Sequence, residues 1–168
     1  HRNPKSVVKA FLLQKPEGNF KWTSLQGEIY GNKLAEVEPY DGFLDFVDLS
    51  RERGHELCII SHKSIYNTLK PYRDLHRAAR NWLSENKVTN PSRLDEKACF
   101  FECTQQEKIL RIQKEKCDIF IDDLIAIFKN NEFPSCTHKI LFGFREHNHD
   151  SISSWHEAFE LIDKIPNK

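Results

Sequence analysis

The spacing of hydrophobic residues divides this chain into alternating helical and extended segments. Apolar residues three and four positions apart predict helices over residues 4–13, 42–54, 72–85, 105–114, 123–130 and 154–162. Short apolar runs, typical of buried strands, cover residues 56–61, 98–101, 118–121 and 139–142. Residues 15–38 show no clear periodicity and are left without a predicted structure.

From Pro39 onward, strands and helices alternate in a regular order. Such an order predicts right-handed crossovers and a mainly parallel sheet with helices on both faces. The expected fold class is therefore α/β, a Rossmann-like three-layer αβα sandwich over residues 39–168, with a small helical segment at residues 1–38.

Composition narrows the range of partners. The 168 residues carry 25 Lys and Arg against 25 Asp and Glu, so no net field attracts nucleic acid or an anionic membrane. No apolar stretch approaches the roughly 20 residues of a membrane span. We therefore expect neither a nucleic-acid partner nor a membrane partner, and a cytoplasmic location.

Neither the spacing of the cysteines nor that of the histidines is typical of a metal site. The five cysteines cannot all pair, and reduced core thiols fit them better than a disulfide framework. A zinc site at Cys99 and Cys103 lacks a second ligand pair. His147, His149 and Asp150 are more typical of a polar loop than of a metal centre.

Four polar residues do suggest chemistry. Asp122 and Asp123 end one apolar run and precede another, a setting in which carboxylates need a cation such as Mg²⁺. Ser61 ends an earlier strand, and Lys108 lies near the start of the intervening helix. Because ligands bind beyond the carboxyl ends of parallel strands, we expect these residues, with Glu102 and Thr104 after the second strand, to meet at one edge and handle phosphate.

Simpler interpretations of the same residues stay open. Asp122 and Asp123 could cap the helix that follows them, where the helix dipole favours negative charge. Ser61 could be an ordinary hydroxyl at a strand end. Lys108 could be an exposed lysine on the surface of its helix.

The order of an apolar strand ending in Ser, then Lys, then an apolar strand ending in Asp-Asp resembles motifs two, three and four of the haloacid dehalogenase-like (HAD) hydrolase superfamily. The matching stretches are residues 57–63, 106–109 and 118–123. The resemblance extends over residues 39–142, including the order of strands and helices. It implies an enzyme that uses Mg²⁺, with Asp122, together with Asp123, as metal ligands.

The resemblance also assigns roles to four other residues. Ser61 would bind phosphoryl oxygens, and Lys108 would stabilise the charge of a phosphoaspartyl intermediate. His62 and Lys63 lie next to this phosphate pocket and would contact the substrate, a small phosphorylated metabolite.

The first motif of that superfamily, a strand ending in Asp-x-Asp that supplies the nucleophile, has no match here. Asp41, Asp45 and Asp48 open or lie within a predicted helix, and residues 1–38 contain no aspartate. The central first strand is thus missing, which predicts a gap between two groups of strands. The chain also contains no methionine. We expect the strand and its nucleophile upstream of residue 1, and residues 1–38 to be a cap or insert.

Two functions follow from these features. The leading one is a Mg²⁺-dependent phosphohydrolase that acts through an aspartyl-phosphate. The alternative is a catalytically inactive HAD-like binding or scaffolding domain. A response-regulator receiver domain is disfavoured because its acidic pair comes first in the chain, whereas here the acids come last.

Overall fold

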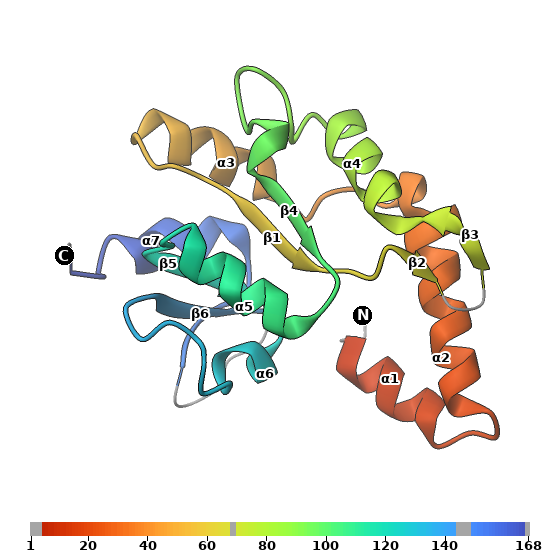
Figure 1. The fold of residues 1–168 in the computed structure, drawn as a ribbon. Helices are drawn as coiled ribbons and strands as arrows, with labels where there is room; N and C mark the ends of the chain where they lie inside the picture. The colour runs from red at the N-terminus through yellow and green to blue at the C-terminus, as the bar shows by residue number, and fades with distance from the viewer. Residues whose placement is uncertain (1–4, 68–69, 144–148, 167–168) are drawn as a thin grey trace.

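The computed structural model describes residues 5–67, 70–143 and 149–166, which form a mixed α/β fold (Figure 1). Its α-helices are α1 (Lys5–Leu13), α2 (Gly18–Gly27), α3 (Phe43–Glu52), α4 (Leu75–Glu85), α5 (Gln105–Lys114), α6 (Ile125–Phe128) and α7 (Ala158–Ile162). Its strands are β1 (Ile59–His62), β2 (Tyr66–Asn67), β3 (Lys70–Asp74), β4 (Cys99–Glu102), β5 (Ile119–Asp122), β6 (His138–Phe142) and β7 (Asp150–Ile152). Short helical turns are η1 (Glu28–Asn32), η2 (Leu34–Glu36), η3 (Glu96–Ala98) and η4 (Trp155–Glu157).

The strands form two small parallel sheets and one antiparallel pair. β1 pairs with β4, β6 lies between β5 and β7, and β2 pairs with β3 in a hairpin. Within the described ranges, no strand pairing joins β1 to β5. The interruption falls between the strand that carries Ser61 and the strand that carries Asp122, where the sequence predicted a gap.

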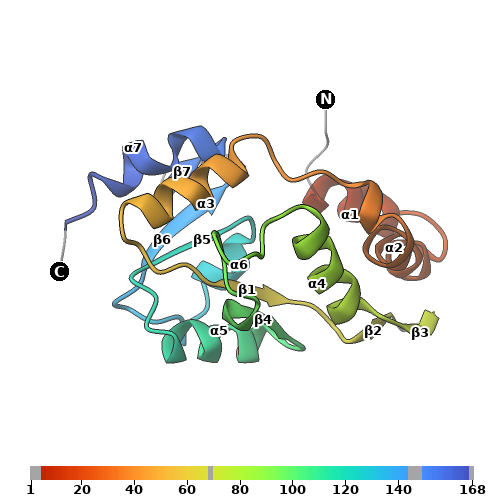
Figure 2. The same ribbon diagram turned by 90° about the horizontal axis from the view of Figure 1, so that it is seen from above.

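Helices lie on both sides of these strands. Figure 2 shows α3 and α7 on one side and α5 on the other. Two hydrophobic clusters fill the spaces between. One contains Ile60, Ile112, Phe120, Ile127, Phe128, Phe133 and Leu141. The other contains Phe46, Val47, Ile140, Ile152, Ala158 and Phe159. Neighbouring residues of β6, Ile140 and Leu141, belong to different clusters, which explains why that strand is a continuous apolar run.

The helix predicted over residues 72–85 is wrong in its first turn. Residues 70–74 form β3, and the helix begins at Leu75. Asp74 ends the strand because its carboxylate caps α4, accepting a hydrogen bond from the Arg77 N–H at 2.9 Å. The hairpin of β2 and β3 was not predicted, since its strands are too short to show an alternating pattern.

Two further elements differ from the sequence prediction. Only residues 125–128 of the predicted helix over 123–130 are α-helical, and the last helix begins as the turn η4. β7 was missed because Asp150 and Ser151 interrupt any apolar run. Asp150 is hydrogen-bonded to His138 of the neighbouring strand, with 2.7 Å between Oδ2 and Nε2. His147 lies outside the described residues.

Residues 15–38, which the sequence pattern left unassigned, contain α2, η1 and η2. Gly18 begins α2 immediately after the turn that follows α1. A Cβ at this position would lie 2.4 Å from the carbonyl oxygen of Leu12. The close approach of the two helices therefore depends on glycine at position 18.

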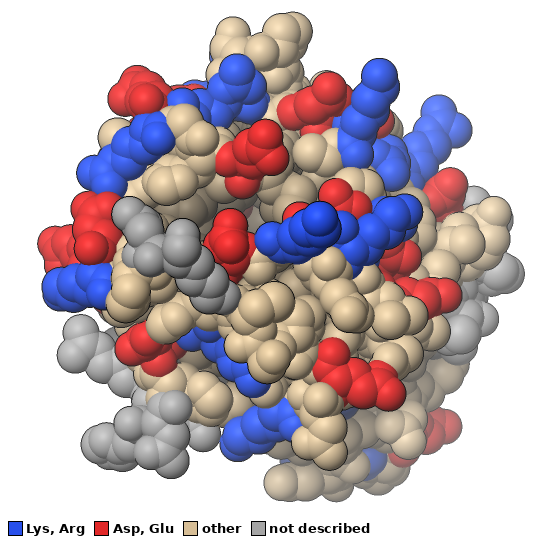
Figure 3. All heavy atoms as spheres, turned by 60° about the vertical axis from the view of Figure 1, so that its left-hand side comes forward, with Lys and Arg blue, Asp and Glu red and all other residues tan. Residues whose placement is uncertain are grey.

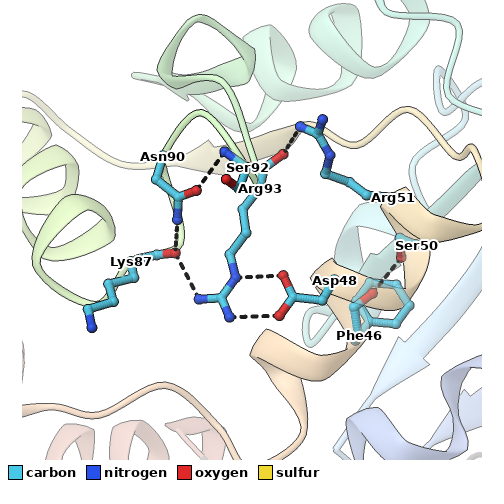
Figure 4. A network of polar contacts seen from close by, with 8 residues as sticks. All are labelled: Phe46, Asp48, Ser50, Arg51, Lys87, Asn90, Ser92 and Arg93. Atoms are coloured by element: carbon cyan, nitrogen blue, oxygen red, sulfur yellow. Dashed lines mark hydrogen bonds and ion pairs between the residues drawn. The ribbon is translucent and has the colours of Figure 1, made fainter.

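A polar network attaches α3 to the loop that precedes β4 (Figure 4). The Arg93 guanidinium donates to both carboxylate oxygens of Asp48, at 2.6 and 2.7 Å, and to the carbonyl oxygen of Lys87 at 3.0 Å. Arg51 donates in turn to the carbonyl oxygen of Arg93 at 2.5 Å. The hydrogen bonds from Arg93 lower the pKa of the Asp48 carboxyl.

Candidate functional site

A buried ion pair lies at the carboxyl end of β5. The Lys108 ammonium donates to Oδ2 of Asp122, and the two side chains are only 6% and 7% exposed. The other carboxylate oxygen, Oδ1, accepts the backbone N–H of Leu124 at 2.8 Å. The ammonium also lies 5.3 Å from the centre of the Phe120 ring. Both oxygens of Asp122 therefore have a partner within the chain.

The start of α5 fixes Lys108 in this position. Thr104 accepts the Glu107 N–H at 3.1 Å, and the Glu107 carboxylate accepts the Thr104 N–H at 2.9 Å. This reciprocal pair is a capping box, which defines where the helix begins. Lys108 follows directly, in the first turn, on the face that packs inward. The simpler interpretation of Lys108 as an exposed lysine is wrong.

Ser61 and His62 lie at the carboxyl end of β1. Ser61 is in register with Phe101 of the parallel strand β4, and His62 with Glu102. Because α5 follows β4 and its first turn reaches Asp122, the carboxyl ends of β1, β4 and β5 face the same edge of the molecule. Ser61 is half-buried and His62 is exposed. Among the described residues, no hydrogen bond joins Ser61 to Lys108 or Asp122.

Lys63 connects this edge to the segment of residues 1–38. Its backbone N–H donates to the carbonyl oxygen of Glu102 at 2.8 Å. Its ammonium lies 4.1 Å from the centre of the Tyr30 ring, which belongs to η1. Its own carbonyl oxygen is 2.5 Å from Nε2 of His76. The structure thus places Lys63 where the expected cap segment meets the end of β1.

The other acidic residues at this edge, Asp123 and Glu102, lie in environments that differ from that of Asp122. Asp123 is exposed, in contrast to its neighbour Asp122. Glu102 accepts a hydrogen bond from Nε of Arg111 at 2.7 Å, and Arg111 also pairs with Glu115 at 3.2 Å. The bond to Glu102 raises the pKa of the Arg111 guanidinium. Of the acids at this edge, Asp122 alone is buried beside a lysine.

The donor set does not complete a Mg²⁺ site. Magnesium requires near-octahedral oxygen coordination, in which waters and substrate phosphates usually complete the one or two carboxylates of the protein. Asp122 already binds Lys108 and the Leu124 N–H, and Asp123 is exposed. In the parts of the chain that the structure describes, no group of three His, Cys, Asp or Glu side chains could hold a metal ion. The described residues therefore show no preformed metal site, and Mg²⁺ binding at Asp122 and Asp123 stays a prediction.

The structure brings together one pair that the sequence pattern did not connect. The Sγ atoms of Cys58 and Cys117 lie 3.9 Å apart. A signal was present, because Cys58 lies within the strand predicted over residues 56–61 and Cys117 directly precedes the strand predicted over residues 118–121. Tyr30 and His76 were missed as neighbours of Lys63, and no spacing in the sequence relates them to it.

Comparison with known proteins assigns no family. No protein-family model matches the chain, and no curated protein or solved structure shows significant similarity to it.

No helix within the described ranges is long and apolar enough to cross a membrane. Acidic and basic side chains are interspersed on the face shown in Figure 3.

Proposed function

We propose that this chain belongs to a HAD-like phosphohydrolase that removes phosphate from a small phosphorylated metabolite. A strand between β1 and β5 would carry the nucleophilic aspartate and turn the two parallel sheets into one, as in a Rossmann-like αβα sandwich. The observation that carries the proposal is the buried Lys108–Asp122 pair, which lies at the same edge as Ser61. A cation, a carboxylate and a hydroxyl at the ends of parallel strands are the groups that phosphoryl transfer requires.

In this proposal each residue has a separate task. The Ser61 hydroxyl donates to a phosphoryl oxygen. Lys108 uses one ammonium hydrogen for Asp122 and offers the others to phosphate, where charge-assisted hydrogen bonds are strongest. The attacking aspartate displaces the alcohol, which leaves with a proton, and water then releases phosphate from the phosphoaspartate. Lys63 and His62 lie beside this position and would contact the rest of the substrate.

The test is hydrolysis of a generic phosphomonoester by a polypeptide that contains this chain. We expect Ser61→Ala to reduce kcat/KM by about 10- to 100-fold, since a hydrogen bond to a charged group contributes roughly 1.5–3 kcal/mol. Ser64→Ala is the matched control, because Ser64 is exposed and lies three residues further along the chain, just beyond the end of β1. Equal activity of the Ser61→Ala variant and the parent would remove Ser61 from the site.

Asp122→Asn tests the other half of the site. It should abolish turnover, whereas Asp118→Asn, at an exposed aspartate just before the same strand, should leave turnover unchanged. Circular dichroism of both variants separates loss of activity from loss of folding. Full activity of a folded Asp122→Asn variant would contradict the proposed site.

One observation favours the inactive binding domain as a second candidate. Both carboxylate oxygens of Asp122 have partners within the chain, Lys108 and the Leu124 N–H, which a purely structural pair would also show. This candidate predicts that the 168 residues fold cooperatively and show no turnover with any divalent metal. Measurable hydrolysis that Asp122→Asn removes would exclude it.

A further inference from the structure

Two thiols meet where β1 and β5 begin. Cys58 directly precedes β1 and Cys117 lies just before β5, with their Sγ atoms 3.9 Å apart. Both pack against the hydrophobic cluster that contains Ile60 and Phe120. Neither is fully buried, so a small oxidant can reach them. The pair lies at the amino ends of the two strands, opposite to the edge that carries Ser61 and Asp122.

The two thiols are chemically unequal. The hydrogen bond from Cys58 lowers the pKa of Cys117, and the same contact raises the pKa of Cys58. Partial burial and the nearby Glu115 carboxylate act against ionisation of either group. Because the sulfur atoms lie 3.9 Å apart, each thiol can resolve an oxidised intermediate on the other, and the direction of the pKa shifts favours Cys117 as the attacking thiol.

The other cysteines have different surroundings. Cys99 is 2% exposed, and burial raises its pKa to about 11. Its sulfur donates to the carbonyl oxygen of Asp95 at 3.9 Å. Cys103 and Cys136 are exposed. Cys58 and Cys117 are the pair whose sulfur atoms the structure brings to 3.9 Å of each other.

We propose that Cys58 and Cys117 are a redox-active pair, which peroxide converts into a disulfide that joins the amino ends of β1 and β5. The Cys117 thiolate attacks one oxygen of hydrogen peroxide, and with one proton this gives a sulfenic acid and water. The Cys58 sulfur then attacks the Cys117 sulfur and loses its proton. The S–O bond breaks, and a second water leaves. Two thiols and one peroxide thus become one disulfide and two waters.

The disulfide has a geometric consequence for the gap between the sheets. A disulfide requires its Cα atoms to lie within about 6.8 Å of each other. Two strands that flank a third are separated by about 9.5 Å, twice the spacing of neighbouring strands. The linked state therefore excludes a strand between β1 and β5 at this end. The link therefore competes with the strand that the proposed phosphohydrolase places in this gap, and it forms where the gap between the two sheets is open.

The test is peptide mapping of the folded protein after treatment with hydrogen peroxide and alkylation of the remaining thiols. Trypsin separates the two cysteines, because Cys58 falls in residues 54–63 and Cys117 in residues 117–129. Mass spectrometry should find these two peptides linked, lighter by two hydrogens than their sum. We expect this pair to exceed any other cysteine pair by at least about tenfold, since thiol–disulfide chemistry follows proximity and thiolate character. A reducing agent should reverse the link.

Two results would overturn the proposal. One is the absence of this link at a peroxide dose that oxidises the exposed Cys103 and Cys136. The other is a mixture in which all cysteine pairs form to similar extents, as in an unfolded chain. In the Cys58→Ser variant, residues 117–129 should gain a sulfenic acid that dimedone traps. No increase in trapping over the parent protein would exclude Cys117 as the attacking thiol.

Discussion

Two ion pairs in this molecule have similar partners and very different surroundings. Arg93 and Asp48 meet at the surface, with side chains that are 21% and 41% exposed, and the guanidinium makes two parallel bonds to the carboxylate. Lys108 and Asp122 meet in the interior through a single ammonium contact. The surface pair has an evident structural role, because it attaches a loop to α3. The buried pair must overcome the desolvation of two charges, so stability alone does not explain it.

The largest expected effect comes from breaking the buried pair. Lys108→Met leaves the Asp122 carboxylate buried without its cation and should lower the free energy of unfolding by about 3–5 kcal/mol. Urea denaturation at pH 7 measures the change. Lys114→Met, at an exposed lysine of the same helix, should change stability by no more than about 0.5 kcal/mol. Equal stability of the two variants would contradict the burial of Lys108.

Replacing both partners should recover much of that loss. In Lys108→Met/Asp122→Asn the buried charges are gone, while the Asn carbonyl still accepts the Leu124 N–H. The double variant should therefore be more stable than Lys108→Met alone, by roughly 1–3 kcal/mol. The same denaturation experiment, run as a double-mutant cycle, gives this difference. Additive effects of the two substitutions would mean that the side chains do not interact.

The surface pair should contribute less. Arg93→Met removes a bidentate but partly exposed interaction and should cost about 1 kcal/mol of unfolding free energy. Arg77→Met is a suitable control because that side chain is exposed on α4. If Arg93→Met destabilised the protein as much as Lys108→Met, burial would not be the property that distinguishes the two pairs.

A smaller effect depends on pH. The folded-state pKa of Asp48 lies below its ordinary value of 3.8, because Arg93 hydrogen-bonds to the ionised carboxyl. Its stabilising contribution is therefore fully present above pH 3.8 and declines as pH falls through the folded-state pKa. The stability difference between the parent and Asp48→Asn should be constant near neutral pH and should shrink below about pH 4. A difference that grows on acidification would contradict the sign of this shift.

Added salt should produce the smallest effect, a change in how much each substitution lowers the free energy of unfolding. Raising NaCl from about 0.1 to 1 M shortens the Debye length from roughly 10 to 3 Å and screens exposed charges far more than buried ones. The cost of Arg93→Met should fall by a few tenths of a kcal/mol, and the cost of Lys108→Met should stay nearly constant. Denaturation of both variants at the two salt concentrations measures this. Equal salt dependence would place the pairs in similar environments.

The sequence predicted most of the regular elements but few of the contacts between them. Helix α5 was predicted with its observed bounds because its capping residues and apolar spacing agree. The strands β1, β4, β5 and β6 were located to within a few residues because buried parallel strands are continuous apolar runs. The hairpin of β2 and β3 and the strand β7 were missed, since two- to five-residue strands with polar positions carry no periodic signal.

The candidate site was predictable only in part, because some of its contacts depend on how the helices and strands pack together. Strand order placed Ser61 and Asp122 at one edge, because parallel strands share the direction of their carboxyl ends. The direct contact of Lys108 with Asp122 depends on the side chain turning inward from the first turn of α5. Likewise, Glu102 binds Arg111, which lies nine residues further along the chain. Such pairings depend on tertiary packing, which spacing along the sequence does not encode.

The buried pair also constrains how this sequence can change over evolutionary time. Loss of either Lys108 or Asp122 alone leaves an unpaired charge in the interior, whereas simultaneous replacement by neutral residues removes it. A protein in which only one of these two positions has changed is therefore less stable than the parent. Positions 108 and 122 should accordingly covary among descendants of this chain.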